Sequence, residues 1–266
     1  MADELERGQV ANSAATYYEE QFVPALFGQF APHVCDAAGL AEGMQVLDVA
    51  CGTGALTREV AGCVGATGRA VGLDRNAAML AVARTATPNG EFFEGMAEVL
   101  PFEDDSFDAV VSQFGLMFFE DRRNGLAEMG RVARAGSPIA VAVWAELTET
   151  PPFYELSKIF DDVVGSNAGD GLRVPYSMGN TDELVALAEE ANLSQPNTER
   201  VSGRAQFSSV AEFVTTEVRG WTLSSSVTDE ILSDMIALAE TRIAGQGRDQ
   251  GGFGFTCPAI ILNAKA

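Results

Sequence analysis

Basic residues are scarce in this sequence, and two kinds of them are almost absent. His33 is the only histidine, and Lys158 and Lys265 are the only lysines. Lysine and arginine together number 17 against 38 aspartates and glutamates, which leaves a formal net charge of −21 at pH 7. A field of that sign repels phosphate backbones and anionic lipid headgroups. The composition therefore argues against nucleic acids and membrane surfaces as partners.

Two further absences narrow the class of protein. The four cysteines form no CxxC pair, and with a single histidine the chain offers no recognisable metal site. No apolar run reaches the about 18–20 residues that a membrane span needs. The first 20 residues lack the basic and apolar regions of a signal peptide. These features predict a cytoplasmic protein with reduced, mostly buried thiols.

The composition is typical of a globular protein with a full core. Of the 266 residues, 47% are hydrophobic and 21% are charged, which argues against global disorder. No internal repeat and no low-complexity linker interrupts the sequence, so we expect a single domain over residues 1–266. Its expected parts are a helical cap (1–42), a core (43–145), two lid insertions (146–180 and 208–250), and a completing helix and strands (181–207 and 251–266).

Short apolar strands alternate with helices across the core segment. The strands are apolar on both faces, which is typical of parallel βαβ units and predicts an α/β fold with a doubly wound, mostly parallel sheet. Residues 13–40 are expected to form a helix that Pro24 and Pro32 kink or divide. Residues 254–266 predict a terminal strand, and Pro258 places that strand near an edge or puts the proline at a strand start.

The strongest functional signal lies where the first core strand passes into a helix, in the segment VLDVACGTG at residues 46–54. Gly52 and Gly54 allow a ligand to approach the backbone, because a Cβ there would clash or forbid the required dihedral angles. The following helix directs unpaired N–H groups into the same space. Asp74 ends the next strand, which in a doubly wound sheet lies beside this turn. A carboxylate there can accept hydrogen bonds from a ribose diol.

These segments resemble the class I S-adenosylmethionine-dependent methyltransferases, in the branch that includes the ubiquinone and menaquinone biosynthesis C-methyltransferases. The string VLDVACGTGALTREVA is similar to the first motif of that branch, with Ala50 where a glycine is frequent. GMAEVLPF at residues 95–102 resembles the segment GDAxxLPF, with Met96 in place of Asp, and FDAVVSQF at residues 107–114 resembles the fourth strand. The resemblance covers residues 40–145. It implies a Rossmann-like methyltransferase fold with an antiparallel C-terminal strand and helical lid insertions.

The resemblance also implies which residues meet the cofactor, S-adenosyl-L-methionine. Asp48 would lie beneath its ammonium group, Asp74 would bind its ribose, and Met79 would pack on its adenine. The Ala97 N–H would read the adenine edge, and Tyr17 would meet the methionine end. The expected cofactor-binding residues are Tyr17, Asp48, Ala50, Cys51, Gly52, Gly54, Asp74, Arg75, Met79, Met96, Ala97 and Gln113.

A nicotinamide dinucleotide fold is the alternative use of such a glycine-rich turn. Its fingerprint, GxGxxG, requires a third glycine where this chain has Thr57. Asp48 inside the strand would repel a pyrophosphate, whereas a ligand that carries a sulfonium and an ammonium group suits both carboxylates. The methyltransferase interpretation is therefore favoured over a dehydrogenase.

Methyl transfer from a sulfonium needs positioning, a dry site and, for some acceptors, a base. His33 is the single histidine that is available as a general base, and no other catalytic residue is assigned. The sequence predicts in-line methyl transfer to O, N or C of a small, largely apolar molecule, driven mainly by proximity and desolvation. The alternatives are a methyltransferase that acts on protein or RNA, and a catalytically silent scaffold that binds S-adenosylmethionine.

Aromatic side chains of the cap, the core edge and the lid are the expected substrate contacts, since related enzymes fold such segments over the open side of the cofactor site. An apolar small molecule is the acceptor that they suit. The sequence is compatible with a monomer and with a homodimer. The expected substrate-binding residues are Tyr18, Phe22, Phe114, Trp144, Tyr176 and Trp221.

Overall fold

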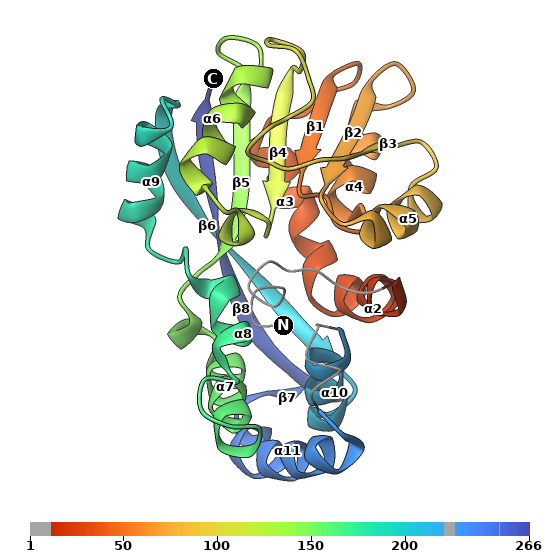
Figure 1. Ribbon diagram of the computed structural model, residues 1–266, viewed down its shortest axis with the longest axis vertical. Coiled ribbons are helices and arrows are strands. Elements are labelled where there is room, and N and C mark those ends of the chain that lie inside the picture. The colour runs from red at the N-terminus through yellow and green to blue at the C-terminus, as the bar shows by residue number, and fades with distance from the viewer. Residues whose placement is uncertain (1–11, 221–226, 250) are drawn as a thin grey trace.

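The computed structural model describes residues 12–220, 227–249 and 251–266, and a single twisted sheet runs through the centre of the molecule (Figure 1). Its strands are β1 (Gln45–Val49), β2 (Arg69–Asp74), β3 (Glu91–Glu94), β4 (Ala109–Gln113), β5 (Pro138–Trp144), β6 (Ser194–Phe207), β7 (Arg248–Asp249) and β8 (Gly252–Lys265). Their order is β3-β2-β1-β4-β5-β8-β6, and β7 pairs with β8. The expected doubly wound, mostly parallel sheet is confirmed.

Strands β1 to β5 are parallel, and the chain order reverses between β1 and β4. In β1, Asp48 lies opposite Gly72 of β2 on one side and Val111 of β4 on the other. In open α/β sheets a crevice forms at the carboxyl ends of the strands where the order reverses. The topology therefore places the ends of β1, β2 and β4 around one crevice.

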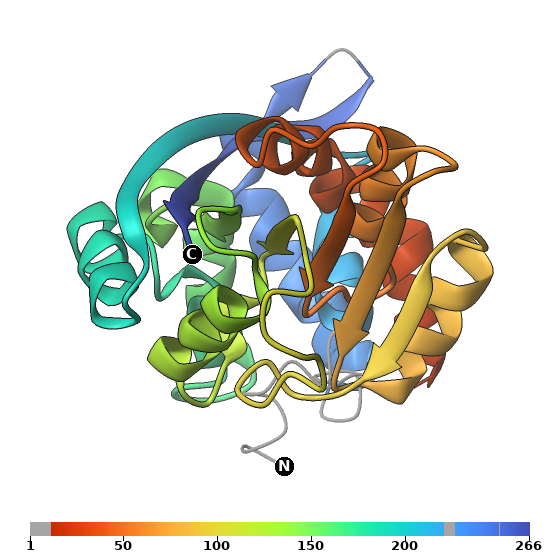
Figure 2. The same cartoon turned by 90° about the horizontal axis from the view of Figure 1, so that it is seen from above.

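Helices cover both faces of the sheet (Figure 2). They are α2 (Asn12–Tyr17), α3 (Ala31–Ala37), α4 (Ala55–Val64), α5 (Ala77–Ala86), α6 (Arg122–Val132), α7 (Pro151–Val163), α8 (Asp170–Arg173), α9 (Thr181–Glu190), α10 (Val210–Gly220) and α11 (Asp229–Arg242). On one face α3 packs against α4, and on the other α6 packs against α9. Short 3₁₀ turns connect several of them, at Leu116–Phe118, Leu147–Glu149, Val174–Tyr176 and Ala244–Gln246.

The expected N-terminal helix is divided into short helices, one of which contains Pro24 and another of which begins directly before Pro32. After α2 the chain forms a π-helix, Tyr18–Phe27, that contains Pro24, and a 3₁₀ turn precedes α3, which has Pro32 in its first turn. A proline lacks the N–H that an α-helix interior needs and clashes with the carbonyl one turn before it, and the wider π-turn accommodates both defects. Gln113 Nε2, at the tip of β4, donates a hydrogen bond of 3.2 Å to the Phe27 carbonyl. This bond ties the end of the π-helix to the carboxyl edge of the sheet.

The C-terminal strand is antiparallel to β5, as expected, but it is not at an edge, because β8 lies between β5 and β6. Pro258 lies inside this strand, opposite Ser202 of β6, and its carbonyl accepts a hydrogen bond of 3.1 Å from Ala145 N–H. The last β5–β8 pair is Trp144 with Ala259. The proline nitrogen faces the same side as its carbonyl, one residue beyond the last β5–β8 pair, so the missing N–H affects only the end of that ladder.

Beyond the end of β5, strands β6 and β8 continue as a two-stranded ribbon, and α7, α8, α10 and α11 gather around it (Figure 1). A cluster of aromatic rings fills the space between ribbon and helices. The centroids of Phe153 on α7, Phe213 on α10 and Phe255 on β8 lie 5.1–5.5 Å from one another. The two segments that we expected to form lid insertions thus share one aromatic core, although they lie far apart in the sequence.

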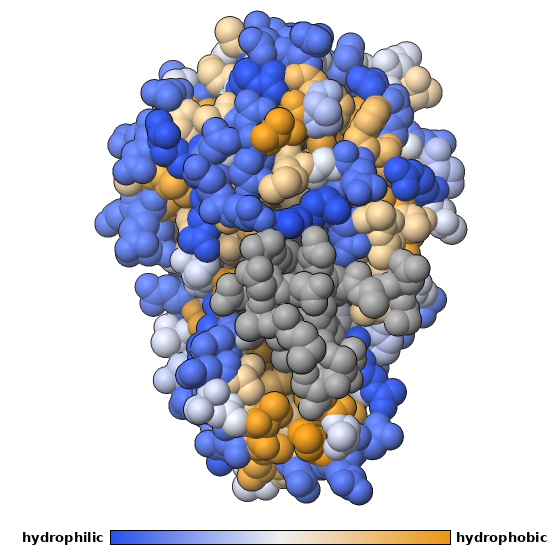
Figure 3. Space-filling model, viewed as in Figure 1, coloured by the Kyte–Doolittle hydropathy of each residue, from blue (hydrophilic) through white to orange (hydrophobic). Residues whose placement is uncertain are grey.

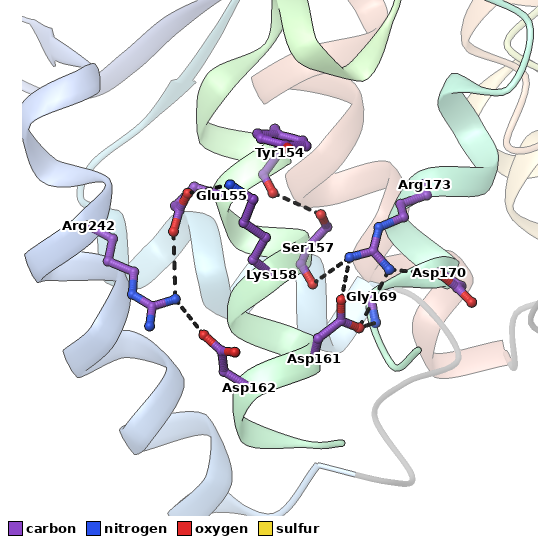
Figure 4. Close-up of polar contacts among 10 residues, drawn as sticks. All are labelled: Tyr154, Glu155, Ser157, Lys158, Asp161, Asp162, Gly169, Asp170, Arg173 and Arg242. Atoms are coloured by element: carbon purple, nitrogen blue, oxygen red, sulfur yellow. Dashed lines mark hydrogen bonds and ion pairs between the residues drawn. The ribbon is translucent and has the colours of Figure 1, made fainter. Parts of the chain in front are cut away.

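Ion pairs on the outer side of α7 hold its neighbours in place (Figure 4). Arg173 of α8 bonds to Asp161 of α7, whose Oδ1 also accepts the Gly169 N–H at 2.9 Å. Arg242 of α11 pairs with Asp162 at 2.6 Å. These contacts leave the opposite side of α7 free to present Phe153 to the interior.

Hydrophilic residues cover most of the face shown in Figure 3, in keeping with the large negative charge. Within the residues that the structure describes, no helix combines the length and the apolar character that crossing a bilayer would require.

We expect two glycine-to-alanine changes to have opposite effects. A Cβ at Gly203 of β6 would lie 2.2 Å from Cζ of Phe30, whose ring is itself packed edge-on against Phe114 and Trp144. Gly203→Ala should therefore lower the free energy of unfolding by about 1–3 kcal/mol. Gly62 lies on the exposed side of α4 with no atom near its Cβ position, so Gly62→Ala should raise it by up to about 1 kcal/mol.

Urea denaturation of the two variants beside the unchanged protein measures both effects. Equal stability of the Gly203→Ala variant and the unchanged protein would show that the Phe30 ring is not confined as described.

Candidate functional site

A cavity with an empty volume of about 1140 Å³ opens at the carboxyl ends of β1, β2, β4 and β5. It is lined by ten of the twelve residues expected to bind the cofactor and by three of the six expected to bind substrate. The ten are Asp48, Ala50, Cys51, Gly52, Asp74, Arg75, Met79, Met96, Ala97 and Gln113, and the three are Tyr18, Phe114 and Trp144.

The turn after β1 has a left-handed backbone at three positions. The φ angles of Ala50, Gly52 and Gly54 are 59°, 55° and 83°. A Cβ built at Gly52 meets nothing within 4 Å, so this glycine faces open space in the cavity. A Cβ at Gly54 would instead lie 3.3 Å from Ala83 and from the Phe92 ring, and Gly54 does not line the cavity. Gly54 thus serves the close packing of the turn against Ala83 and Phe92, and its expected contact with the cofactor stays a prediction.

Asp48 is the most deeply buried charged group of the cavity wall, with 1% of its surface exposed. Its Oδ2 accepts a hydrogen bond of 2.6 Å from the Thr57 hydroxyl, whereas its Oδ1 is buried without a hydrogen-bond partner. The pKa of Asp48 is raised to about 7, mainly by burial and also by nearby Asp74, while the bond from Thr57 opposes the shift. A carboxylate in this setting is complementary to a cation, which would supply the missing partner.

Thr57 is a site residue that sequence reasoning missed. It stands three residues after Gly54, at the position where a dinucleotide fingerprint has its third glycine. On the first turn of α4 its hydroxyl faces back toward β1 and reaches Asp48. The departure from GxGxxG therefore has a physical meaning, because the side chain that replaces the glycine fixes the orientation of the buried carboxylate.

Asp74, at the end of β2, organises the turn as well as facing the cavity. Its Oδ2 accepts the Gly52 N–H and its Oδ1 accepts the Asn76 N–H, both at 2.8 Å. Asn76 in turn caps α5 by accepting the N–H groups of Ala78 and Met79. Burial raises the pKa of Asp74, although the two backbone hydrogen bonds and Arg75 oppose the shift. Since each carboxylate oxygen can accept two hydrogen bonds, both oxygens keep one further acceptor position.

The wall opposite these carboxylates is aromatic. Phe114 follows β4 with a φ of 55°, and its ring stacks on Trp144 at the end of β5, with 3.8 Å between centroids and 8° between planes. Phe27, at the end of the π-helix, packs against both rings. Gly115 is required beside them, because a Cβ there would lie 2.6 Å from that of Ala50. Phe27 was not among the expected substrate contacts, although it is part of the aromatic N-terminal segment.

The loop at residues 95–99 forms another side of the cavity. Met96, which replaces the aspartate of the family motif, lines it and is 38% exposed. Glu98 also lines the cavity, but its Oε1 accepts the Glu120 N–H at 2.7 Å. The Glu98 carboxylate thus accepts a hydrogen bond from the segment before α6.

Several expected site residues lie elsewhere. Tyr17 does not line the cavity, because its hydroxyl points to Thr216 on α10 at 3.4 Å, and the adjacent Tyr18 takes the place at the wall. Phe22 and Tyr176 line a second, smaller cavity and not the first. His33 is exposed on α3 and lines neither cavity. Trp221 lies outside the described residues.

Comparisons with known proteins agree with this geometry. A family model described as a methyltransferase domain matches residues 46–136. The chain is 41% identical over 119 residues to a ubiquinone/menaquinone biosynthesis C-methyltransferase of Hahella chejuensis, which covers 42% of this chain and 48% of that protein. Its match to the enzyme of the same name from Cronobacter sakazakii is 33% identical over 188 residues and covers 63% of this chain and 73% of that protein. The chain belongs to the class I S-adenosylmethionine-dependent methyltransferases.

In most of these curated relatives the match spans about half of the relative's length or less. Among solved structures, a phosphoethanolamine N-methyltransferase of Haemonchus contortus, bound to phosphomonomethylethanolamine and S-adenosylhomocysteine, has a TM-score of 0.61 at 16% identity. The superposition covers 99% of this chain and 59% of that one, and it shows the common fold. Class I methyltransferases use S-adenosylmethionine, and the unpartnered Asp48 oxygen together with the open space at Gly52 fits that cationic group.

We expect Asp48 to make the stability of the ligand-free protein depend on pH. Its folded pKa of about 7 lies above the ordinary value of 3.8, so the stabilising protonated form is complete below about pH 4 and is lost as the pH rises through 7. Relative to an Asp48→Asn variant, the unchanged protein should lose about 1.4 kcal/mol per pH unit in this range, and the difference should level off above pH 7.

Denaturant titrations at pH 5, 6, 7 and 8 measure this difference, with Glu103→Gln, a change at an exposed loop residue, as the control. A difference between the Asp48→Asn and unchanged proteins that stays constant across the range would contradict the raised pKa.

Proposed function

We propose that this chain transfers the methyl group of S-adenosylmethionine to a small, largely apolar acceptor molecule. One observation carries the proposal: a single cavity joins the buried, half-satisfied carboxylate of Asp48 to an aromatic wall built on Phe114 and Trp144. The carboxylate suits a cationic methyl donor, and the wall suits an apolar acceptor beside it.

The cofactor would be held by residues from three strand ends. Asp48 would bind its ammonium group, and the free acceptor positions of Asp74 would take its ribose hydroxyls. Met79 and the backbone of Ala97, which line the same cavity, would contact its adenine. When bound, the cofactor supplies a methyl group that is already activated by a sulfonium.

The protein's own contribution to the reaction would be orientation and the exclusion of water. The aromatic wall is dry, since Phe114 and Trp144 are 7% and 3% exposed, and it faces the strand ends at which the donor would lie. His33 is exposed on α3 and is not part of the cavity lining, so it is not proposed as a base. Within the described part of the chain, no group of three or more His, Cys, Asp or Glu side chains could hold a metal ion. Proximity and desolvation are therefore the proposed sources of rate enhancement.

The acceptor is proposed from the geometry and not from the relatives. Their names refer to ubiquinone, menaquinone and demethylmenaquinone. However, the family model ends at residue 136, before Trp144 and Pro175, which line the apolar side of the cavity. A small molecule is favoured over RNA because the net charge is −21.

Calorimetric titration with S-adenosylmethionine and a methyl-transfer assay with labelled donor test the proposal. Donor binding without transfer to any of a range of small acceptors would favour the scaffold alternative, and absence of donor binding would refute the assignment.

Replacing Asp74 by alanine should weaken the affinity for S-adenosylmethionine by about 10–150-fold, which corresponds to about 1.5–3 kcal/mol for a lost charge-assisted hydrogen bond. The loss has two causes, since Asp74 also orders Gly52 and the start of α5. Calorimetry measures the affinity. Glu103→Ala removes the same charge from an exposed loop and should leave the affinity unchanged. Normal affinity in the Asp74→Ala variant would exclude Asp74 from the site.

Replacing His33 by alanine should lower the turnover number less than about tenfold, because the side chain is exposed on α3 and lines neither cavity. Loss of a general base would cost about 10²–10⁴-fold. Catalysis should also be insensitive to chelators. Steady-state kinetics on the His33→Ala variant and the unchanged protein, each with and without EDTA, provide the test. A loss of about 10³-fold with normal cofactor affinity would make His33 a base after all.

A further inference from the structure

One end of the cofactor cavity lies between the end of β2 and the loop at residues 95–99, where the proposed function places the base of the methyl donor. Leu73, Met79 and Met96 line this end and give it apolar walls. Met79 also packs against α2, which holds its side chain in the wall. A flat base fits such walls through dispersion contacts, and these contacts do not depend on which polar groups its edge carries.

The polar side chains at this end already have partners within the protein. Arg75 pairs with Glu120 at 3.4 Å, and Asn76 caps α5 through its Oδ1. Oε1 of Glu98 accepts the N–H groups of Glu120 and Asp121, at 2.7 and 3.4 Å. Each of the three side chains therefore has a structural partner that a bound base would have to displace or share.

Position 96 adds no side-chain acceptor to this end of the cavity. Met96 stands where the family motif has an aspartate, and its carbonyl already accepts the Val99 N–H at 3.2 Å. The Met96 side chain is 38% exposed, so this edge of the cavity borders water. An amino group on the base would keep its hydration there instead of exchanging water for a carboxylate.

A backbone donor is present at the same edge. Ala97 is buried and lines the cavity, and its N–H donates to no residue that the structure describes. A ring nitrogen with a lone pair would satisfy this donor, whereas a ring N–H would oppose it. The edge is therefore complementary to a hydrogen-bond acceptor on the base and has no side chain dedicated to a donor.

We propose that, with Met96 at this edge, the chain selects the unprotonated ring nitrogen N1 of the donor's base and does not select its 6-amino group. The inference rests on the proposed function for placing the base at this end of the cavity. A site rejects an analogue that lacks a polar group when the site's own partner for that group is left unpaired. Position 96 holds no such partner, so removal of the amino group leaves nothing unpaired. The ligand class is thus a purine nucleoside sulfonium whose 6-substituent is not recognised.

Calorimetry with three product analogues tests the proposal without turnover. The probes are S-adenosylhomocysteine, its analogue with hydrogen in place of the 6-amino group, and S-inosylhomocysteine, whose N1 carries a hydrogen. We expect the 6-hydrogen analogue to bind within about threefold of S-adenosylhomocysteine, and S-inosylhomocysteine to bind about 10–100-fold more weakly.

The outcomes separate this proposal from the proposed function. A larger loss for the 6-hydrogen analogue, or equal binding of S-inosylhomocysteine, would overturn the proposal and leave the proposed function standing. Failure of all three probes to bind would refute the proposed function itself.

Three variants locate the effect through the ratio of two affinities, that for S-adenosylhomocysteine over that for the 6-hydrogen analogue. Met96→Asp supplies the missing acceptor and should raise the ratio to about 5–50. Val99→Asp adds the same charge to the same loop, at a side chain that is 73% exposed and does not line the cavity, and should leave the ratio near one. Glu98→Ala should also leave it near one. A ratio that stays near one in Met96→Asp, or a preference for the amino group that depends on Glu98, would overturn the role of residue 96.

Discussion

A carboxylate is held inside the sheet with only one of its two oxygens satisfied, and much of this protein is arranged around that constraint. Asp48 lies in a central strand between β2 and β4 and is 1% exposed. Thr57 fixes one oxygen, and the other faces a cavity. Burying a charge in this way costs stability unless a partner arrives. A cationic ligand would offset this cost by pairing with the buried carboxylate.

The neighbouring turn depends on the second carboxylate. Asp74 bonds to Gly52 and to the N-terminus of the next helix, so that two loops from adjacent strand ends are locked together before any ligand binds. The left-handed backbone at Ala50 and Gly52 turns the chain away from the space that the ligand would fill. Because these hydrogen bonds lie within the chain, they order the turn without help from a ligand, which lowers the ordering cost of binding.

The aromatic partition connects the conventional core to the lid. Phe114 and Trp144 belong to core strand ends, Phe27 belongs to the N-terminal segment, and the three rings pack on one another. Gln113 fastens the Phe27 carbonyl to β4, and Gly203 leaves room for the Phe30 ring behind the stack. On the far side, Phe153 and Tyr176 continue the aromatic surface toward Glu217. The same ring stack thus lines the cofactor cavity and packs against the aromatic core of the lid.

The sequence by itself determined the parallel core, the antiparallel last strand and the position of the cofactor crevice. Those features follow from local patterns: apolar strands at βα spacing, a glycine-rich turn, and carboxylates at strand ends. Only the tertiary structure decided that Tyr18 and not Tyr17 faces the cavity, because the contact of Tyr17 with Thr216 of α10 depends on how two segments far apart in the chain pack together. It also decided that Gly54 packs against Ala83 and Phe92 and that Thr57 orients Asp48. Glu217 lies beside the buried rings of Phe22 and Phe153 for the same reason. These roles depend on contacts between segments far apart in the chain, and the periodicity of one segment does not encode which surface of another it will meet.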